Sequence, residues 1–228
     1  MNIYEATPIS QLLEGNSYPG RGIIIGRSAD GKNAVAAYFI MGRSANSRNR
    51  VFEEKDGCLY TAPYDASMVV DPSLIIYPAI REFENHLIVT NGDQTNTVYE
   101  GLKNGISFDA ALSTRQFEPE GPNWTPRISG MLTFGKGDFA YRMSILKCGD
   151  AAGTVCWRFG FHYASLPGRT EMYCGSQRYR CLCRRDLERS GCGQQDLPLC
   201  PLYRPVLRLQ DQPHHQHESV RSMQNERI

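Results

Sequence analysis

The chain of 228 residues lacks any hydrophobic run that approaches the roughly 20 residues of a membrane-spanning helix. Its first residues lack the basic stretch and apolar core of a signal peptide. It also lacks an excess of one charge, because 25 Lys and Arg stand against 24 Asp and Glu. These absences argue against a membrane protein, a secreted protein and a protein that binds nucleic acid through bulk electrostatics. We therefore expect a cytoplasmic globular protein.

Lysine is absent after Lys147, although arginine continues to the end of the chain. Five of the eight cysteines crowd the same last quarter: Cys174, Cys181, Cys183, Cys192 and Cys200. This crowding argues against a secreted disulfide framework, which spreads its cysteines through the core. No strand or helix periodicity is sustained there either. The composition predicts a domain of residues 1–163, followed by a divergent tail of residues 164–228 that is disordered or translated in a shifted frame.

A zinc module is the alternative interpretation of the tail. Cys181 and Cys183 are separated by one residue, which is too close for the usual zinc-binding pair. No second pair of cysteines has a standard spacing. We therefore predict no metal site in this chain.

Two apolar runs near the N-terminus, Gly22–Gly26 and Ala34–Met41, flank the turn sequence Asp30-Gly31 and predict a β-hairpin. Serine, asparagine and five arginines surround it: Arg21, Arg27, Arg43, Arg48 and Arg50. Guanidinium groups bind phosphate through paired hydrogen bonds, so this composition favours an anion site. A solvated basic edge that discourages aggregation is the alternative, and composition does not decide between them.

The remaining domain has mainly strand character. We expect strands at residues 73–77, 86–90, 128–134, 139–146 and 155–163, and a loop from residue 53 to residue 72. A helix with Val98 and Leu102 on its apolar side follows the second of these strands, and Ser107 begins a further short helix. The pattern predicts an α+β fold dominated by antiparallel sheet.

Two segments place polar side chains where a ligand could meet them. Asn91, Asp93 and Thr95 lie at a strand-to-helix turn, where backbone N–H groups point outward. Helix capping is the simpler interpretation of these residues. The loop 117–127 contains three prolines, which fix its backbone and hold Glu118, Asn123 and Arg127 in defined directions.

Five stretches, in this order along the chain, together resemble one family, the IMP cyclohydrolases of archaeal type. They are YPGRGIIIGRSADGK (Tyr18–Lys32), GRSANSRNRVF (Gly42–Phe52), DPSLIIY (Asp71–Tyr77), TNGDQTNT (Thr90–Thr97) and TPRISG (Thr125–Gly130). The resemblance implies a four-layer α-β-β-α sandwich like that of the N-terminal nucleophile hydrolases. Met1-Asn2-Ile3 offers no such nucleophile, and nothing after Tyr163 matches the family.

The resemblance also implies an activity. It is the closure of 5-formamidoimidazole-4-carboxamide ribonucleotide (FAICAR) to IMP with loss of water, the last step of de novo purine synthesis, without a cofactor. Catalytic roles are implied for Tyr77, Asn91 and Glu118, although Glu120 lies only two residues from Glu118 and leaves that assignment open. Implied substrate contacts are Arg21, Arg27, Arg43, Asn49, Arg50, Asp93, Thr95, Asn123 and Arg127.

Other functions remain as alternatives. One is a purine-nucleotide-binding homologue that has lost activity with its terminus. Another is an interaction protein whose tail binds zinc or nucleic acid. For the enzyme, the expected partner is the purine ribonucleotide FAICAR or IMP, with no nucleic acid or membrane involved, and homo-oligomerisation is left open.

Overall fold

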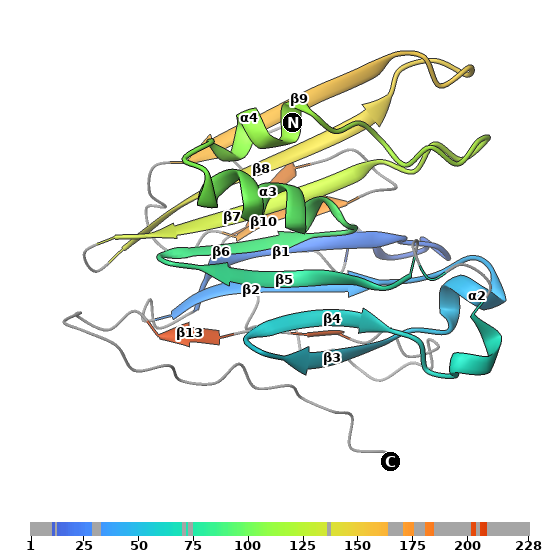
Figure 1. Ribbon diagram of the computed structural model, residues 1–228, viewed down its shortest axis with the longest axis horizontal. Helices are drawn as coiled ribbons and strands as arrows, with labels where there is room; N and C mark the ends of the chain where they lie inside the picture. Colours follow the sequence, from blue (N-terminus) through green and yellow to red (C-terminus); the bar gives the residue numbers. More distant parts are fainter. Residues whose placement is uncertain are drawn as a thin grey trace.

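A computed structural model describes residues 11, 13–28, 33–69, 72, 75–135 and 138–163, and the backbone of four strands between residues 171 and 208. Two β-sheets pack face to face, and helices α3 (Gln94–Lys103) and α4 (Phe108–Ser113) cover the outer face of one sheet (Figure 1). The architecture is therefore α+β and mostly antiparallel sheet, as the sequence predicts.

The first sheet is built on the predicted hairpin of β1 (Arg21–Arg27) and β2 (Asn33–Ile40), which pair with Ile24 opposite Ala37. Its strand order is β11-β10-β1-β2-β12, and β13 also pairs with β2. The added strands are β10 (Glu171–Gly175), β11 (Cys181–Arg184), β12 (Leu202–Tyr203) and β13 (Val206–Arg208). The predicted turn at Asp30-Gly31 lies outside the described residues.

The second sheet is a seven-stranded antiparallel meander in chain order. Its strands are β3 (Val51–Lys55), β4 (Cys58–Ala62), β5 (Tyr77–Phe83), β6 (His86–Thr90), β7 (Arg127–Phe134), β8 (Phe139–Cys148) and β9 (Cys156–Tyr163). The strands expected at 86–90, 128–134, 139–146 and 155–163 are thus confirmed. Helix α4 begins after Ser107, whose hydroxyl accepts a hydrogen bond from the Ala110 N–H as a helix cap.

The loop expected from residue 53 to residue 72 is wrong over its first part. β3 and β4 form a hairpin there, and Asp56 and Gly57 make its turn with φ angles of 51° and 70°. β3 is an exposed edge strand with three charged residues in succession, so it lacks the alternation that marks a half-buried strand. Of the strand expected at 73–77, residues 73 and 74 lie outside the described residues, Ile75 and Ile76 are not in a strand, and Tyr77 begins β5.

The main core lies between the two sheets. Side chains of β1 and β2, such as Ile23 and Tyr38, meet side chains of the meander, such as Leu87 and Ile128. A second cluster joins the helices to the outer face of the meander through Val98 and other apolar residues. Burying each large apolar side chain contributes about 1.5–3 kcal/mol, so these two clusters fix the strand ends that carry the polar residues described below.

Two short helical segments lie in the connections: α2 (Ala45–Arg48) links β2 of the first sheet to β3 of the second, and the 3-10 turn η1 (Ala66–Met68) follows β4 within the second sheet. Beyond residue 163, the described backbone consists of the strands β10 to β13. The remainder of the predicted tail, and the side chains of its five cysteines, lie outside the described residues. The domain boundary near residue 163 stays a prediction. Within the described part, no helix has the length and apolar character needed to cross a bilayer.

Candidate active site

A cleft of about 220 Å³ opens where the start of β1, the segment after β2 and the proline-containing loop 117–127 meet. It combines three arginines, two carboxylates, small polar side chains and a few apolar groups. The residues that line it are Tyr18, Arg21, Met41, Gly42, Arg43, Ser44, Asn46, Ser47, Arg50, Ile75, Glu118, Glu120, Asn123 and Thr125. Such a lining suits a ligand that has an anionic end and a polar planar part.

One wall of the cleft is a buried ion pair between Arg21 and Glu118. Arg21 Nη1 donates to Glu118 Oε1 at 3.0 Å, and Nη2 donates to Oε2 at 2.9 Å. Arg21 Nη1 also donates to the Asn91 carbonyl at 2.8 Å. Burial is the largest influence and lowers the pKa of Arg21, but the Glu118 carboxylate together with Tyr77 and Tyr38 outweighs burial and raises that pKa above its usual value. The guanidinium is therefore charged, and its two hydrogen bonds hold Glu118 in a fixed orientation.

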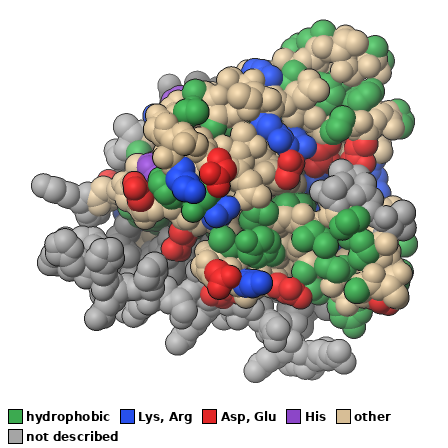
Figure 2. Space-filling view, viewed as in Figure 1, with side chains coloured by type: hydrophobic (Ala, Val, Ile, Leu, Met, Phe, Trp, Pro, Cys, Tyr) green, Lys and Arg blue, Asp and Glu red, His purple; other side chains and the backbone are tan. Residues whose placement is uncertain are grey.

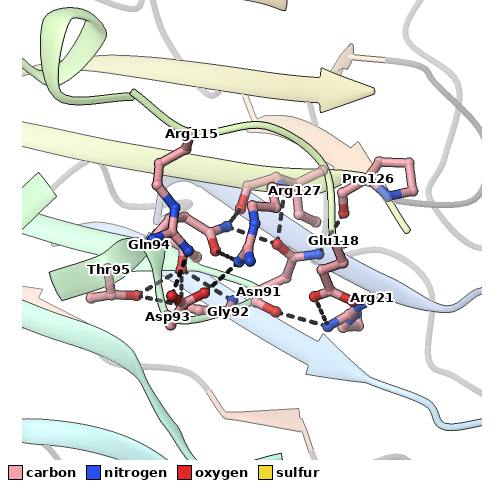
Figure 3. A network of polar contacts seen from close by, with 12 residues as sticks. Arg21, Asn91, Gly92, Asp93, Gln94, Thr95, Arg115, Glu118, Pro126 and Arg127 are labelled. Atoms are coloured by element: carbon pink, nitrogen blue, oxygen red, sulfur yellow. Dashed lines mark hydrogen bonds and ion pairs between the residues drawn. The ribbon is translucent and has the colours of Figure 1, made fainter. Parts of the chain in front are cut away.

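Behind this pair, the Asn91 side chain joins β6, β7 and the start of α3. Its Nδ2 donates to the Pro126 carbonyl at 2.9 Å, while its Oδ1 accepts from the Ile128 N–H at 2.9 Å and from Gln94 Nε2 at 2.9 Å. The residue is fully buried. Figure 3 shows the network running from Arg21 through Asn91 to Gln94. Asn91 therefore fixes the turn against the strand that follows the proline-containing loop.

Asp93 occupies the N-cap position of α3 but makes no side-chain capping bond. Its carboxylate instead accepts from Arg127 Nη1 at 2.6 Å and forms an ion pair with Arg115 (Figure 3). Arg127 Nη1 also donates to Gln94 Oε1 at 2.7 Å. Burial by itself raises the pKa of Asp93, but the two arginines outweigh burial and lower that pKa. Asp93 and Arg127 thus neutralise each other at the strand-to-helix turn.

The opposite wall of the cleft carries two arginines, Arg43 and Arg50, whose guanidinium groups are not held, within the described part of the chain, in ion pairs like that of Arg21. Arg50 donates from Nε to the Ser47 carbonyl at 2.7 Å, but its Nη1 is buried and has no hydrogen-bond partner among the described residues. Arg43 stacks over the Tyr18 ring at 5.3 Å. The hydroxyls of Ser44 and Ser47 are part of the cap of α2. A buried guanidinium nitrogen without a partner is costly, so this wall favours an anionic ligand.

Glu120 is the second carboxyl group of the cleft. It accepts a hydrogen bond from the Thr125 hydroxyl at 3.2 Å. Burial raises the pKa of Glu120, and the neighbouring Glu118 carboxylate raises it further. A like charge nearby disfavours ionisation of a carboxyl group, and Glu118 is the one that pairs with Arg21. Glu120 is therefore a carboxyl group of this cleft whose pKa lies above its usual value.

Comparison with known proteins decides the family. A family model described as "IMP cyclohydrolase-like protein" matches residues 18–158, which include every residue that lines the cleft. The chain belongs to the IMP cyclohydrolase-like family. A curated IMP cyclohydrolase of Methanopyrus kandleri is 28% identical over 166 residues, covering 68% of this chain and 81% of the relative.

In this member of the IMP cyclohydrolase-like family, the structure brings five of the residues implied by resemblance to the cleft: Arg21, Arg43, Arg50, Glu118 and Asn123. It places others behind the cleft. Tyr77 is buried between the sheets, and its hydroxyl lies 2.8 Å from the Tyr38 hydroxyl. Thr95 is buried, and its hydroxyl lies 2.6 Å from that of Thr90.

Two further residues implied by the resemblance lie in other surroundings. Asn49 exchanges hydrogen bonds of 2.7 Å with the backbone of Asp65 through both ends of its amide, and so joins two loops. Arg27 is at the far end of β1 from Arg21, where it pairs with Asp138 and stacks over Phe139. Arg27 lies six positions along the strand from Arg21, a distance of about 20 Å. Arg27 therefore does not line the cleft.

Sequence reasoning missed two residues that build the site of this family member. Arg115, after α4, pairs with Asp93 across 22 positions of the chain. Tyr38, in the middle of β2, pairs with Tyr77 across 39 positions. Neither belongs to a recognisable local motif, and only the packing of helix and sheets brings them to their partners. Burial raises the pKa of Tyr38 well above its ordinary value, so its hydroxyl keeps its proton.

Proposed function

We propose that this chain is an IMP cyclohydrolase that closes FAICAR to IMP with loss of water. Membership of the IMP cyclohydrolase-like family supports this proposal, as does the curated name of the Methanopyrus relative. The observation that carries it is the composition of the cleft. An anion-binding wall with Arg43 and Arg50 faces a wall with two carboxyl groups, Glu118 paired with Arg21 and Glu120 with a raised pKa.

The substrate's 5′-phosphate binds against Arg43 and Arg50, with Ser44, Asn46 and Ser47 beside it. Arg50 Nη1, buried and without a partner among the described residues, is the donor that an anion would satisfy. Arg21 is already saturated by Glu118 and Asn91, so its role is to hold the Glu118 carboxylate in place. This arrangement leaves the base between the phosphate wall and the carboxyl groups.

The reaction forms one C–N bond and removes one oxygen. The carboxamide nitrogen attacks the formyl carbon, and the formyl oxygen becomes a hydroxyl group that leaves as water. Overall, the carboxamide nitrogen and the formamido nitrogen each give up one proton, and these two protons end on the water that leaves. An amide nitrogen is a poor nucleophile, so holding it against the formyl carbon supplies much of the rate. Glu120 gives a proton to the oxygen and then receives one from nitrogen, which suits a carboxyl group with a raised pKa.

Glu118 orients the carboxamide, and its carboxylate helps to raise the pKa of Glu120. The strand-to-helix turn that faces the substrate's base is positioned by the contacts of Asn91, Asp93 and Arg127. The hydroxyls of Tyr77 and Tyr38 contact each other next to Arg21, and both raise the pKa of its guanidinium. We assign the tyrosine pair a positioning role.

Several finer expectations belong to the same proposal. The outer face of the first sheet carries Ile24, Ala37 and Phe39, and Leu13 packs against them. Cover on that face is what a four-layer sandwich of the N-terminal nucleophile hydrolase type requires. A cytoplasmic location stays a prediction, and so does the absence of nucleic acid among the partners. On the face in Figure 2, basic and acidic side chains lie next to one another rather than in patches of one sign.

The proposal is tested with the purified full-length protein and FAICAR, by following IMP formation through ultraviolet absorbance and confirming the product by mass. Turnover that saturates with FAICAR supports the proposal. Tight binding of IMP by folded protein without turnover of FAICAR would instead identify an impaired nucleotide-binding homologue. Folded protein that neither binds IMP nor converts FAICAR would refute the assignment.

A further inference from the structure

The hairpin of β8 and β9 places two cysteines directly opposite each other, Cys148 and Cys156. At the next rung, the Gly149 N–H donates to the Val155 carbonyl at 2.8 Å. Hydrogen-bonded and non-hydrogen-bonded pairs alternate along an antiparallel ladder, so the cysteines form a non-hydrogen-bonded pair. In such pairs the Cα atoms lie about 4.5 Å apart and the side chains point to the same face.

This spacing is within the range that a disulfide requires, which is roughly 4.4–6.8 Å between Cα atoms. Both thiols are free and partly accessible, in contrast to the buried thiol of Cys58. Cys148 Sγ donates to the Asp150 carbonyl at 2.8 Å, and Cys156 Sγ makes a long contact of 3.8 Å with the Trp157 carbonyl. Such thiol hydrogen bonds are weak and are easily given up.

We propose that Cys148 and Cys156 form a reactive dithiol that closes reversibly into a cross-strand disulfide when it meets a low-molecular-weight disulfide such as glutathione disulfide. One cysteine thiolate attacks a sulfur of the small disulfide and releases one thiol. The second cysteine then attacks the mixed disulfide, which forms the Cys148–Cys156 bond and releases the second thiol. The two protein thiols are oxidised, the small disulfide is reduced, and the two cysteine protons end on the released thiols.

The hairpin tip supports the loop that carries the two carboxyl groups of the cleft. Trp124 Nε1 donates to the Ala151 carbonyl at 3.2 Å, and a Cβ on Gly153 would lie only 2.5 Å from the Trp124 ring. The Trp124 ring packs edge to face on Phe117, with 5.7 Å between ring centres. The disulfide therefore fixes the base of a hairpin whose tip holds Trp124. The proposal itself rests on strand register and does not depend on the reaction that the cleft performs.

The test uses the full chain, equilibrated in glutathione buffers of increasing disulfide content, quenched with acid and treated with N-ethylmaleimide. Trypsin cuts after Lys147 and Arg158, so both cysteines fall in one peptide, residues 148–158. We expect this peptide to lose both maleimide groups together, with the mass of an internal disulfide. Dithiothreitol should restore them.

Three comparisons make the result decisive. The native chain should form the disulfide at a lower glutathione disulfide content than the same chain in urea, because the register preorganises the pair. Cys58→Ser should leave that transition unchanged, whereas Cys148→Ser should leave Cys156 alkylated or joined to glutathione. The proposal is overturned if both cysteines stay alkylated throughout, if they join other cysteines, or if the native and unfolded chains oxidise at the same buffer composition.

Discussion

The substitution Glu118→Gln tests the buried ion pair that forms one wall of the cleft. It keeps the shape of the side chain but removes the negative charge that faces Arg21. The side chains of Arg21 and Glu118 are only 10% and 8% exposed, so water cannot replace the lost charge. Arg21 would then remain charged and buried, with the Asn91 carbonyl and one amide oxygen as its acceptors.

The expected cost follows from that burial. Removing one member of a buried ion pair costs about 3–5 kcal/mol, because the other charge is left without compensation. Glutamine keeps one acceptor, so we expect about 3 kcal/mol, the lower end of that range. For a protein of this size the loss lowers Tm by about 6–12 °C.

The assay is urea unfolding followed by far-ultraviolet circular dichroism, with the same measurement on Glu120→Gln as a matched control. Glu120 forms no ion pair among the described residues, and burial together with Glu118 raises the pKa of its carboxyl group, so removing its charge should cost little stability. Equal losses in the two variants, or an unchanged midpoint for Glu118→Gln, would refute the account of a buried, charged pair.

Three further predictions follow from the same contacts. Gly92→Ala should unfold at a lower urea concentration and bind IMP more weakly, because its Cβ would lie 2.7 Å from Gln94 Oε1; wild-type values would contradict this. Arg50→Met should raise KM for FAICAR more than kcat falls, whereas Arg27→Met, outside the cleft, should leave KM unchanged; equal changes would remove Arg50 from the phosphate site. The raised pKa of Glu120 adds stability below its unfolded value of 4.5, and this is lost as pH rises through the folded pKa. Glu120→Gln should therefore show a flatter loss of unfolding free energy above pH 4.5 than wild type, and parallel curves would contradict the shift.

Local sequence signals predicted the elements that depend on neighbours along the chain. The hairpin of β1 and β2 follows from two apolar runs around Asp30-Gly31, and the start of α4 follows from the capping hydroxyl of Ser107. The edge strand β3 was missed because charged residues on an exposed edge carry no alternation. Its Asp56-Gly57 turn was the available signal for a hairpin.

The site could be predicted only in part, because its partners are distant in the sequence. Sequence reasoning singled out Arg21 and Glu118, but not that they bind each other across 97 positions, which engages the Arg21 guanidinium that a phosphate would otherwise contact. The roles of Glu118 and Glu120 can be told apart only from the structure, which shows that Arg21 pairs with Glu118. The facing of Cys148 and Cys156 likewise depends on strand register, which the cysteine spacing alone does not reveal.

The central claim is that FAICAR is closed to IMP in this cleft, with Glu120 moving the proton. The most direct measurement is the initial rate of IMP formation at saturating FAICAR by the wild-type chain and by Glu120→Gln, alongside the affinity of each for IMP. We predict turnover by the wild type, a loss of about 10²–10⁴-fold in kcat for Glu120→Gln, and similar IMP affinities. Equal rates in the two proteins would contradict the role of Glu120, and a folded wild-type chain that forms no IMP would contradict the assigned reaction.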